Sequence, residues 1–386
     1  MSHTDQARRR RLRVCLISHN YLETRYQTKL RALAHDLQLI QPDVLQFPFG
    51  ALRASPLDVT GMKTVTAHAT FLPGLRTSTR WFLLGIAPAI DEFRPDIIHV
   101  ENEIHSFITL QALLYRKMLC PSAKVGVAFW QNLLVGGRKG PLVAALSWLG
   151  RRSIDYFLPA NIDGQRILQQ AGVPDCRINV FPPIGFAEEW FDRPDERTAL
   201  RQRLGFGPDD YVIGFSGRLV EDKGLNDLLA ARAMLSGRPT RVLLVGHGPM
   251  KPALVASGVT VISPSSPEEA MQWYSVMDTL VLPSRTTDSW KEQFGRVIPE
   301  AMYAGVPVIG SDSGAIPEVI GDAGLIFAEG DPQGLAKAIG RLMDDPGLAQ
   351  RIRKAGRERA TSHYTNTVLA RRTLEVYSIL AGCPIE

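Results

Sequence analysis

Short apolar runs alternate with amphipathic segments along the whole chain, which is the pattern of parallel strands joined by crossover helices. In the first half, the pattern predicts strands at residues 13–18, 65–70, 96–100, 124–130 and 154–158, with helices such as 24–37 and 106–118 between them. In the second half, it predicts strands at 211–216, 241–245, 259–262, 279–282 and 306–311, with partner helices that include 225–235, 267–276, 297–303 and 333–343. The fold class is therefore α/β, built from doubly wound parallel sheets.

The two halves meet at a turn-forming segment. Two prolines and a glycine lie within residues 181–185, directly after a short strand-like run, and such clusters mark boundaries between regular elements. A chain of 386 residues is also longer than one ordinary domain. We therefore predict two Rossmann-like domains, over residues 1–185 and 186–366, that face each other across a cleft.

The composition indicates a folded protein that stays where it is made. Hydrophobic residues make up 45% of the chain and charged residues 22%, which excludes an intrinsically disordered chain. No apolar run approaches the roughly 20 residues that span a bilayer, and the run at 14–18 is too short for a signal-peptide core. The four cysteines match no disulfide or metal-ligand spacing: Cys15, Cys120, Cys176 and Cys383. We therefore expect reduced thiols and a cytoplasmic location.

The amino-terminal half is basic. Residues 1–185 carry 22 Lys and Arg against 13 Asp and Glu, whereas the remainder is acidic on balance. Residues 138–152 have an apolar centre, a tryptophan and basic ends, and residues 81–85 are also apolar and aromatic. This composition suits a helix on the inner face of an anionic membrane. The alternatives are an amphipathic core helix and a scatter of solvated arginines. No aromatic-basic interleaving points to nucleic acid.

Glycines and charged residues gather at the carboxyl ends of strands in the second half. Gly217 and Arg218 follow the strand 211–216, with Lys223 shortly after, and Gly246 follows the strand 241–245. An arginine supplies a planar fork and a lysine a point charge, a combination suited to a diphosphate. Glycine lets a ligand approach the backbone closely. Because the carboxyl ends of parallel strands meet at one edge, these residues share one rim of the sheet.

A third strand end brings two glutamates to the same rim. Glu292 lies in a polar loop after the strand 279–282, a helix is expected to start near Gly295, and Glu300 lies about two turns further on. The backbone N–H groups at this helix start are expected to face phosphate or hydroxyl oxygens. Helix electrostatics alone also explains a pair of glutamates. The shared rim is what favours a binding site.

Polar residues also follow strands in the first half. Glu101, Glu103 and His105 lie at and after the end of the strand 96–100, and Gln131 and Asn132 follow the strand 124–130. Together with His19, after the first strand, they are candidates for binding an acceptor or orienting its hydroxyl. The alternative is helix capping and an ordinary surface histidine. No His/Asp cluster has metal-ligand spacing, so we predict no metal and no cofactor.

The set of motifs resembles the retaining glycosyltransferases of family 4, which have the GT-B fold. The segments that carry the resemblance are 214–224, 246–249, the E-x7-E pair Glu292 and Glu300, 301–309 and 313–319. The first domain matches less well. Its first loop, 18–24, has no glycine, and Gln131-Asn132 stands where many members have a histidine.

The resemblance implies roles for the matching residues. Arg218, Lys223 and Glu292 are the expected catalytic residues, the first two holding the leaving diphosphate and the third lying beside the donor sugar. Glu300 is expected to bind the ribose hydroxyls, and the base to lie near residues 261–263. The further donor-binding residues are Gly217, Gly246, Ile262, Phe294, Gly295 and Arg296. In this fold the last helix, here within 367–386, crosses back onto the first domain.

The predicted reaction is transfer of a hexose-type sugar from a nucleoside diphosphate sugar to an acceptor hydroxyl. A UDP-sugar is favoured over a GDP-sugar as the donor. The acceptor is expected to be lipid-linked or part of a cell-surface polysaccharide, and the nucleotide sugar is a co-substrate. The alternatives are a soluble small-molecule acceptor and a sugar-nucleotide epimerase.

Overall fold

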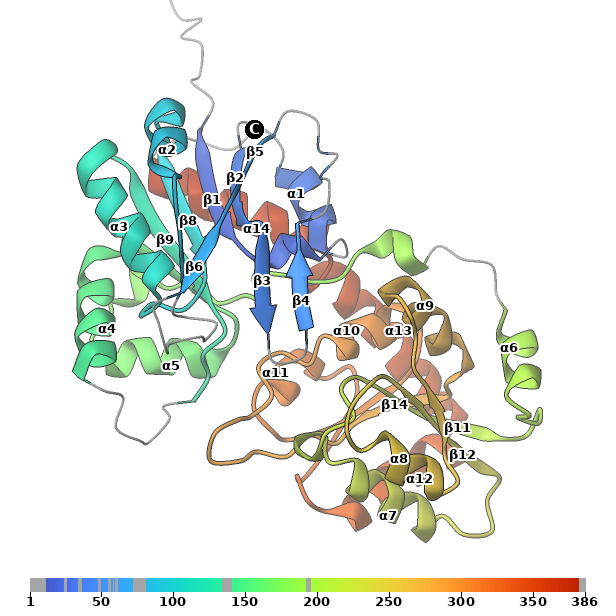
Figure 1. The fold of residues 1–386 in the computed structure, drawn as a ribbon. Helices are drawn as coiled ribbons and strands as arrows, with labels where there is room; N and C mark the ends of the chain where they lie inside the picture. The colour runs from blue at the N-terminus through green and yellow to red at the C-terminus, as the bar shows by residue number, and fades with distance from the viewer. Residues whose placement is uncertain are drawn as a thin grey trace, which may run out of the picture.

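The computed structural model has two lobes, each built on a parallel sheet (Figure 1). It describes residues 12–23, 26–33, 37–47, 50–54, 57, 59, 62–71, 81–133, 141–191 and 196–381. The lobe coloured blue to green contains the first part of the chain, and the lobe coloured yellow-green to orange contains the second. The predicted fold class, α/β with doubly wound parallel sheets, is confirmed.

In the amino-terminal domain, the described strands form a six-stranded sheet in the order β10-β9-β8-β1-β2-β5, with all neighbours parallel. These strands are β1 (Val14–Ser18), β2 (Leu37–Pro42), β5 (Lys63–Ala67), β8 (Ile97–Glu101), β9 (Lys124–Phe129) and β10 (Tyr156–Pro159). Two antiparallel hairpins pair β3 (Val44–Phe47) with β4 (Gly50–Arg53) and β6 (Ala69–Phe71) with β7 (Trp81–Leu83). The helices are α1 (Gln27–Leu33), α2 (Ala87–Phe93), α3 (Phe107–Leu119), α4 (Pro141–Ser153) and α5 (Ile162–Gln170).

The carboxy-terminal domain repeats this plan. Its described strands form a parallel sheet in the order β13-β12-β11-β14-β15-β16. They are β11 (Tyr211–Ser216), β12 (Thr240–Val245), β13 (Thr260–Ile262), β14 (Thr279–Leu282), β15 (Val308–Ser311) and β16 (Leu325–Phe327). The helices are α6 (Arg197–Arg203), α7 (Leu225–Met234), α8 (Lys251–Ala256), α9 (Pro267–Gln272), α10 (Val297–Tyr303), α11 (Ile316–Ile320), α12 (Pro332–Asp344) and α13 (Pro346–His363). The strand order reverses between β11 and β14, which is where ligands of such sheets bind.

The structure differs from the hydrophobic pattern at two places in the first domain. The pattern predicts one strand over 65–70, but β5 and β6 belong to different sheets, because the Asp43 carboxylate binds His68 and the backbone N–H of Ala69 at the break. The pattern also predicts a helix over 24–37, whereas α1 ends at Leu33 and β2 follows. Strand β2 escapes detection because its two glutamines are buried among apolar residues, as a parallel strand covered on both faces allows.

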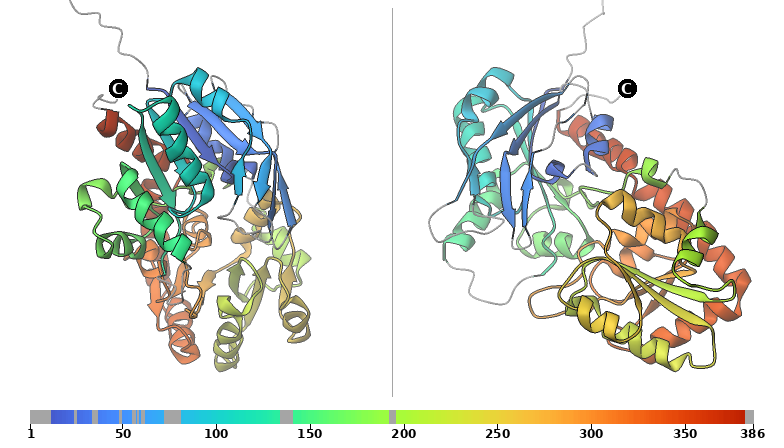
Figure 2. Two further views of the ribbon diagram at one scale, coloured as in Figure 1. Left: turned by 60° about the vertical axis from the view of Figure 1, so that its left-hand side comes forward. Right: turned by 45° about the vertical axis from the view of Figure 1, so that its right-hand side comes forward.

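The chain crosses between the domains twice, at neighbouring positions. Phe186 and Thr365 form a parallel bridge, and the backbone N–H of Gly185 donates to Asn366 Oδ1 at 3.0 Å. The last described helix, α14 (Asn366–Ala381), lies along the first domain in red (Figure 2). Its Tyr377 hydroxyl is hydrogen-bonded to Nδ1 of His99 in β8 at 2.9 Å. The end of the chain is thus part of the amino-terminal core.

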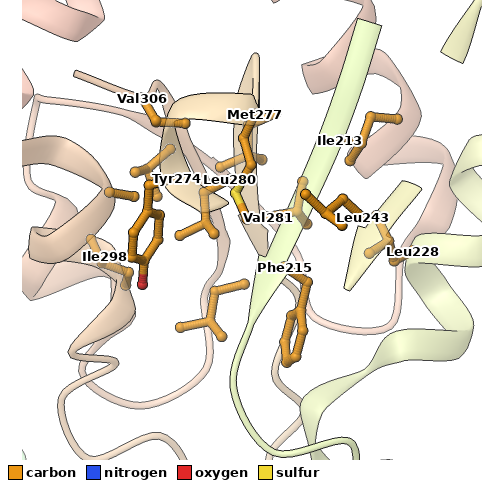
Figure 3. Packing of buried hydrophobic residues seen from close by; sticks show 14 of the residues in the cluster. Ile213, Phe215, Leu228, Leu243, Tyr274, Met277, Leu280, Val281, Ile298 and Val306 are labelled. Atoms are coloured by element: carbon orange, nitrogen blue, oxygen red, sulfur yellow. The ribbon is translucent and has the colours of Figure 1, made fainter. Parts of the chain in front are cut away.

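A continuous apolar core supports the second sheet. Phe215 and Leu243 from neighbouring strands pack with Leu228 of α7, while Leu280 packs towards Tyr274 and Ile298 (Figure 3). Tyr274 is almost completely buried but presents its hydroxyl towards α10. The core therefore places the Tyr274 hydroxyl at the edge of the sheet where open parallel sheets bind their ligands.

Candidate functional site

The crevice at the reversal point of the second sheet is opened by the strands themselves. Strands β11 and β14 pair only through Ile213–Thr279 and Gly214–Leu280, so their carboxyl ends diverge. The loops that follow these two strands carry Arg218 and Lys223 on one side and residues 283–296 on the other. The predicted rim is therefore one continuous edge of the sheet.

A cavity of about 390 Å³ lies at this edge and is lined by Gly217, Arg218, Gly246, Arg296 and Glu300. A Cβ atom on Gly246 would lie 1.8 Å from the Gly217 carbonyl oxygen, so the two loops can only approach this closely because Gly246 lacks a side chain. The cavity continues along residues 264–266. Its size suits a small-molecule ligand such as a nucleoside.

Glu300 is held rigidly in the wall of that cavity. Its carboxylate accepts hydrogen bonds from the Tyr274 hydroxyl at 2.7 Å and from Arg296 Nε at 2.9 Å, and it is only 3% exposed. Burial, together with the nearby Glu300 charge, raises the pKa of Tyr274 well above its ordinary value, so the phenol keeps its proton and donates. Tyr274 was not among the predicted site residues, because in the sequence it reads as an apolar helix position.

Glu292, which is buried, forms an ion pair with the partly buried Lys223. Lys223 Nζ lies 2.5 Å from Glu292 Oε2, and the Ser284 hydroxyl donates to the same oxygen at 3.0 Å. The ammonium group also lies 4.6 Å from the centroid of the Trp290 ring, a distance at which a cation is attracted to the ring face. The pair places a positive and a negative group side by side at the mouth of the crevice, with a neutral donor and an aromatic ring around them.

A second cavity, of about 360 Å³, lies between the domains. It is lined by the loop after β1, including His19, Asn20 and Tyr26, and by Glu292 to Arg296 of the other domain. Burial lowers the pKa of His19 to about 4, so its imidazole is neutral near pH 7. Arg296 donates to the Tyr26 hydroxyl and thereby links the two walls.

A third cavity, of about 250 Å³, lies on the other side of Gln293. It is lined by four of the predicted acceptor-side residues and by Ser289, Trp290 and Gln293 of the facing loop; the four are Glu103, His105, Gln131 and Asn132. The structure thus brings these four residues together although they follow two different strands. The Trp290 ring, which lines the same cavity, lies against Lys223.

Three predicted residues line none of these cavities: Lys223, Glu101 and Ile262. Lys223 contacts the cavity walls through Glu292 and Trp290. The Glu101 carboxylate is 3% exposed, accepts hydrogen bonds from Ser18, Asn20 and Tyr21, and lies 3.7 Å from Lys29 Nζ. In this structure it holds the loop after β1, and an acceptor-binding role for it stays a prediction. Ile262 accepts the Gly246 N–H through its carbonyl oxygen at 2.8 Å, and the cavity wall lies further along, at residues 264–266.

Comparison with known proteins finds a family resemblance in the carboxy-terminal domain. Residues 196–359, most of the carboxy-terminal domain, match the model of the glycosyl transferases group 1 family. The match covers less than half of the chain, which is similar to this family over that stretch. Over 221 residues, 52% of the chain, it is 30% identical to the D-inositol 3-phosphate glycosyltransferase of Nocardia farcinica. Over 349 residues, 87% of the chain and 78% of the relative, it is 27% identical to a glycogen synthase of Mycobacterium tuberculosis.

The matches to the first two curated relatives cover only about half of their length. The chain spans 46% of the length of the Nocardia relative and 53% of that of a second one, from Corynebacterium urealyticum. The likeness to solved structures extends over both domains. Anabaena Alr3699/HepE in complex with UDP superimposes with a TM-score of 0.71 at 16% identity, covering 95% of this chain and 100% of that one. This likeness shows the GT-B fold.

Among the described residues, no group of three or more His, Cys, Asp and Glu side chains is placed to hold a metal ion. The polar groups at this site are instead amides, hydroxyls, the two carboxylates of Glu292 and Glu300, and the three cations of Arg218, Lys223 and Arg296. Each carboxylate already has a cationic neighbour, Lys223 for Glu292 and Arg296 for Glu300. Such an arrangement suits a ligand that carries both hydroxyls and negative charge.

Proposed function

We propose that this protein is a retaining glycosyltransferase that moves a hexose-type sugar from a nucleoside diphosphate to an acceptor hydroxyl. The observation that carries the proposal is the Lys223–Glu292 pair at the strand-order reversal. Its Glu292 lines the interdomain cavity, which shares Arg296 with the nucleoside-sized cavity. A UDP-linked sugar is the first donor to test, because the structurally similar Anabaena protein is a complex with UDP.

The proposed mechanism assigns each charged group a step. The bond between the anomeric carbon and the diphosphate oxygen breaks, a bond from the acceptor oxygen forms on the same face, and the acceptor proton passes to the leaving diphosphate. Arg218 and Lys223 stabilise the charge that develops on that diphosphate. Lys223 leaves its ion pair for the phosphate, and Glu292 then accepts hydrogen bonds from the sugar hydroxyls. Rate enhancement comes from positioning and electrostatics.

The acceptor is expected in the cavity of about 250 Å³ beside Trp290. Carboxylate, imidazole and amide groups line it on the amino-terminal side, and they are suited to binding hydroxyl groups through donors and acceptors alike. The indole offers a flat apolar surface for one face of a sugar or polyol ring. A hydroxyl-rich acceptor therefore fits this cavity better than an acyl chain does.

A surface on α3 and α4 supports a lipid-linked acceptor. Trp148 is 51% exposed and Met118 66% exposed, with Leu149 and Leu114 also exposed on the same two helices, which pack together. Arg152 lies 4.2 Å from the Trp148 ring centroid. Apolar side chains with an indole and a guanidinium are typical of a protein surface that rests on anionic lipid. None of the described helices is long and apolar enough to cross a bilayer.

The experiment for this surface is co-sedimentation with vesicles of mixed anionic and zwitterionic lipid at low salt. The double variant Trp148→Ala with Leu149→Ala is expected to lose binding. The matched control is Ile379→Ala, which removes an apolar side chain that is 79% exposed on α14, and it should bind like the wild type. If the wild type ignores such vesicles, a soluble acceptor replaces the lipid-linked one.

The experiment for the reaction uses Lys223→Ala. We expect loss of turnover by at least about a hundredfold, because a group that stabilises the leaving diphosphate acts in the transition state. Melting temperature and circular dichroism serve as folding controls. Near-normal transfer by a folded Lys223→Ala protein would contradict the role assigned to Lys223. Interconversion of sugar nucleotides without transfer would favour an epimerase.

A further inference from the structure

Two asparagines of the amino-terminal domain reach across to the loop that carries Glu292. Asn132 Nδ2 donates to the Glu292 carbonyl oxygen at 2.8 Å and lies 3.4 Å from that of Lys291. Asn161 Nδ2 donates to the carbonyl oxygen of Gln293 at 2.7 Å. Three consecutive residues of one domain therefore have their backbone held by two side chains of the other.

Both amides are buried and one is fixed in orientation. Asn132 is 5% exposed and Asn161 is 1% exposed. The Oδ1 atom of Asn161 accepts the Gly164 N–H at 2.9 Å and so caps α5. That bond leaves Nδ2 of the same side chain to point at the facing loop. Buried donors and acceptors of this kind are costly to leave unpaired, so each bond is worth more here than on a surface.

The Glu292 carbonyl is held from its own domain as well. The backbone N–H of Ala315 donates to it at 3.0 Å. A Cβ on Gly314 would lie only 2.1 Å from the same oxygen, so the loop lies directly against the backbone at Gly314. The main chain of Glu292 thus lies between Ala315 of its own domain and Asn132 of the other, while its carboxylate is bound to Lys223 and Ser284.

The neighbouring contacts bring the two domains together at the same place. Gln293 Nε2 donates to the Trp130 carbonyl oxygen at 3.0 Å, and Lys291 Nζ lies 2.6 Å from Asp163 Oδ2. Opening the domains would break these contacts together with both asparagine bonds. The loop would then keep only its attachments within the carboxy-terminal domain.

We propose that Asn132 and Asn161 are positioning residues that complete the donor site when the domains close. They place the Glu292 main chain, and through it the carboxylate beside Lys223, by hydrogen bonds to the carbonyl oxygens of residues 292 and 293. Closure is thereby coupled to the correct position of Glu292, as expected where domain motion completes a site. The inference rests on the proposed glycosyltransferase function.

The isosteric variants Asn132→Asp and Asn161→Asp test it. Aspartate keeps the shape of the side chain, and at residue 161 it keeps the cap on α5, because aspartate is as good an N-cap as asparagine. The donor to the facing carbonyl is lost and a negative charge takes its place. The matched control is Gln170→Glu, which makes the same charge change at an exposed position of α5.

We expect kcat to fall about 10- to 100-fold in each aspartate variant, since a buried hydrogen bond is lost and a carbonyl faces a carboxylate. The Kd for the nucleoside diphosphate should stay within about threefold, because the Glu300 cavity lies in the other domain and keeps its contacts. Gln170→Glu should have the same kcat and the same Kd for the nucleoside diphosphate as the wild type. Unchanged kcat, or an equal loss of kcat, nucleotide binding and melting temperature, would overturn the positioning role.

A readout that needs no turnover separates this inference from the proposed function. Hydrogen exchange of a peptide that covers residues 289–296 should be faster in both aspartate variants than in the wild type and the control. If no nucleotide sugar is ever transferred but exchange rises, the proposed function fails while the interdomain bonds stand. If exchange is the same in all four proteins, the bonds do not hold the loop.

Discussion

Replacing Gly314 with alanine tests how tightly the Glu292 main chain is placed. Gly314 has a φ of +55°, and a Cβ there would lie 2.1 Å from the Glu292 carbonyl oxygen, 2.9 Å from its nitrogen and 3.0 Å from its carbonyl carbon. Backbone atoms cannot rotate away as the end of a side chain can. Either the Glu292 loop or the turn at Gly314 must therefore move.

The expected cost has two parts. A left-handed backbone conformation costs a residue with a Cβ roughly 1–2 kcal/mol, and forcing an extra carbon into a packed site typically costs about 1–3 kcal/mol more. The first part can be measured alone at Gly258, which has a φ of +80° and nothing within 4 Å of an added Cβ. Gly314→Ala should thus lower the free energy of unfolding by about 2–5 kcal/mol, and Gly258→Ala by the smaller first part.

Denaturant unfolding and sugar transfer are measured on both variants. Gly258→Ala should keep its transfer rate, whereas the rate of Gly314→Ala should fall about a hundredfold, the typical effect of displacing a catalytic group by about 1 Å. The reasoning would be refuted if the two variants were equally stable and equally active. Loss of stability without loss of rate would mean that the turn at Gly314 moves and Glu292 stays.

Further predictions concern the donor cavity and pH. Glu300→Gln should weaken nucleoside diphosphate binding about 10- to 100-fold in calorimetry, since it removes the charge that holds Arg296 and Tyr274; unaltered affinity would remove Glu300 from the donor site. Burial lowers the pKa of His99 to about 4 from 6.5, so the unfolded chain takes up a proton first as the pH falls. The free energy of unfolding should therefore be highest above about pH 6.5 and lose up to ~3 kcal/mol through this group by pH 4. In His99→Gln this part of the loss of unfolding free energy at acid pH should be absent. A pH profile of stability equal to that of the wild type would argue against the role of His99.

The convergence of the carboxy-terminal residues on one edge was predictable because they follow the strand ends. Gly217, Arg218 and Gly246 come directly after buried strands in the sequence, and parallel strands bring such positions to one edge. Tyr274 and Ser284 lack such a signal. Tyr274 lies in an apolar turn, and only the packing of the core shows that its hydroxyl reaches Glu300.

The amino-terminal side was less predictable, since what it does depends on contacts between residues far apart in the chain. Glu101 lies at a strand end, where a ligand-binding residue is expected, yet it is buried beneath the first loop against Lys29 and Tyr21. Asn132 was predicted on the acceptor side from its position alone. Its bond to the Glu292 carbonyl joins residues 160 positions apart, and no local pattern encodes such a pairing.

The most direct test of the account is to incubate the protein with a panel of nucleotide sugars and follow both nucleoside diphosphate release and melting temperature. We predict that at least one nucleotide sugar raises the melting temperature and releases its diphosphate. In Lys223→Ala the release should be lost while the protein still folds. A wild-type protein that responds to none of the panel, in release or in melting, would contradict the proposed donor site.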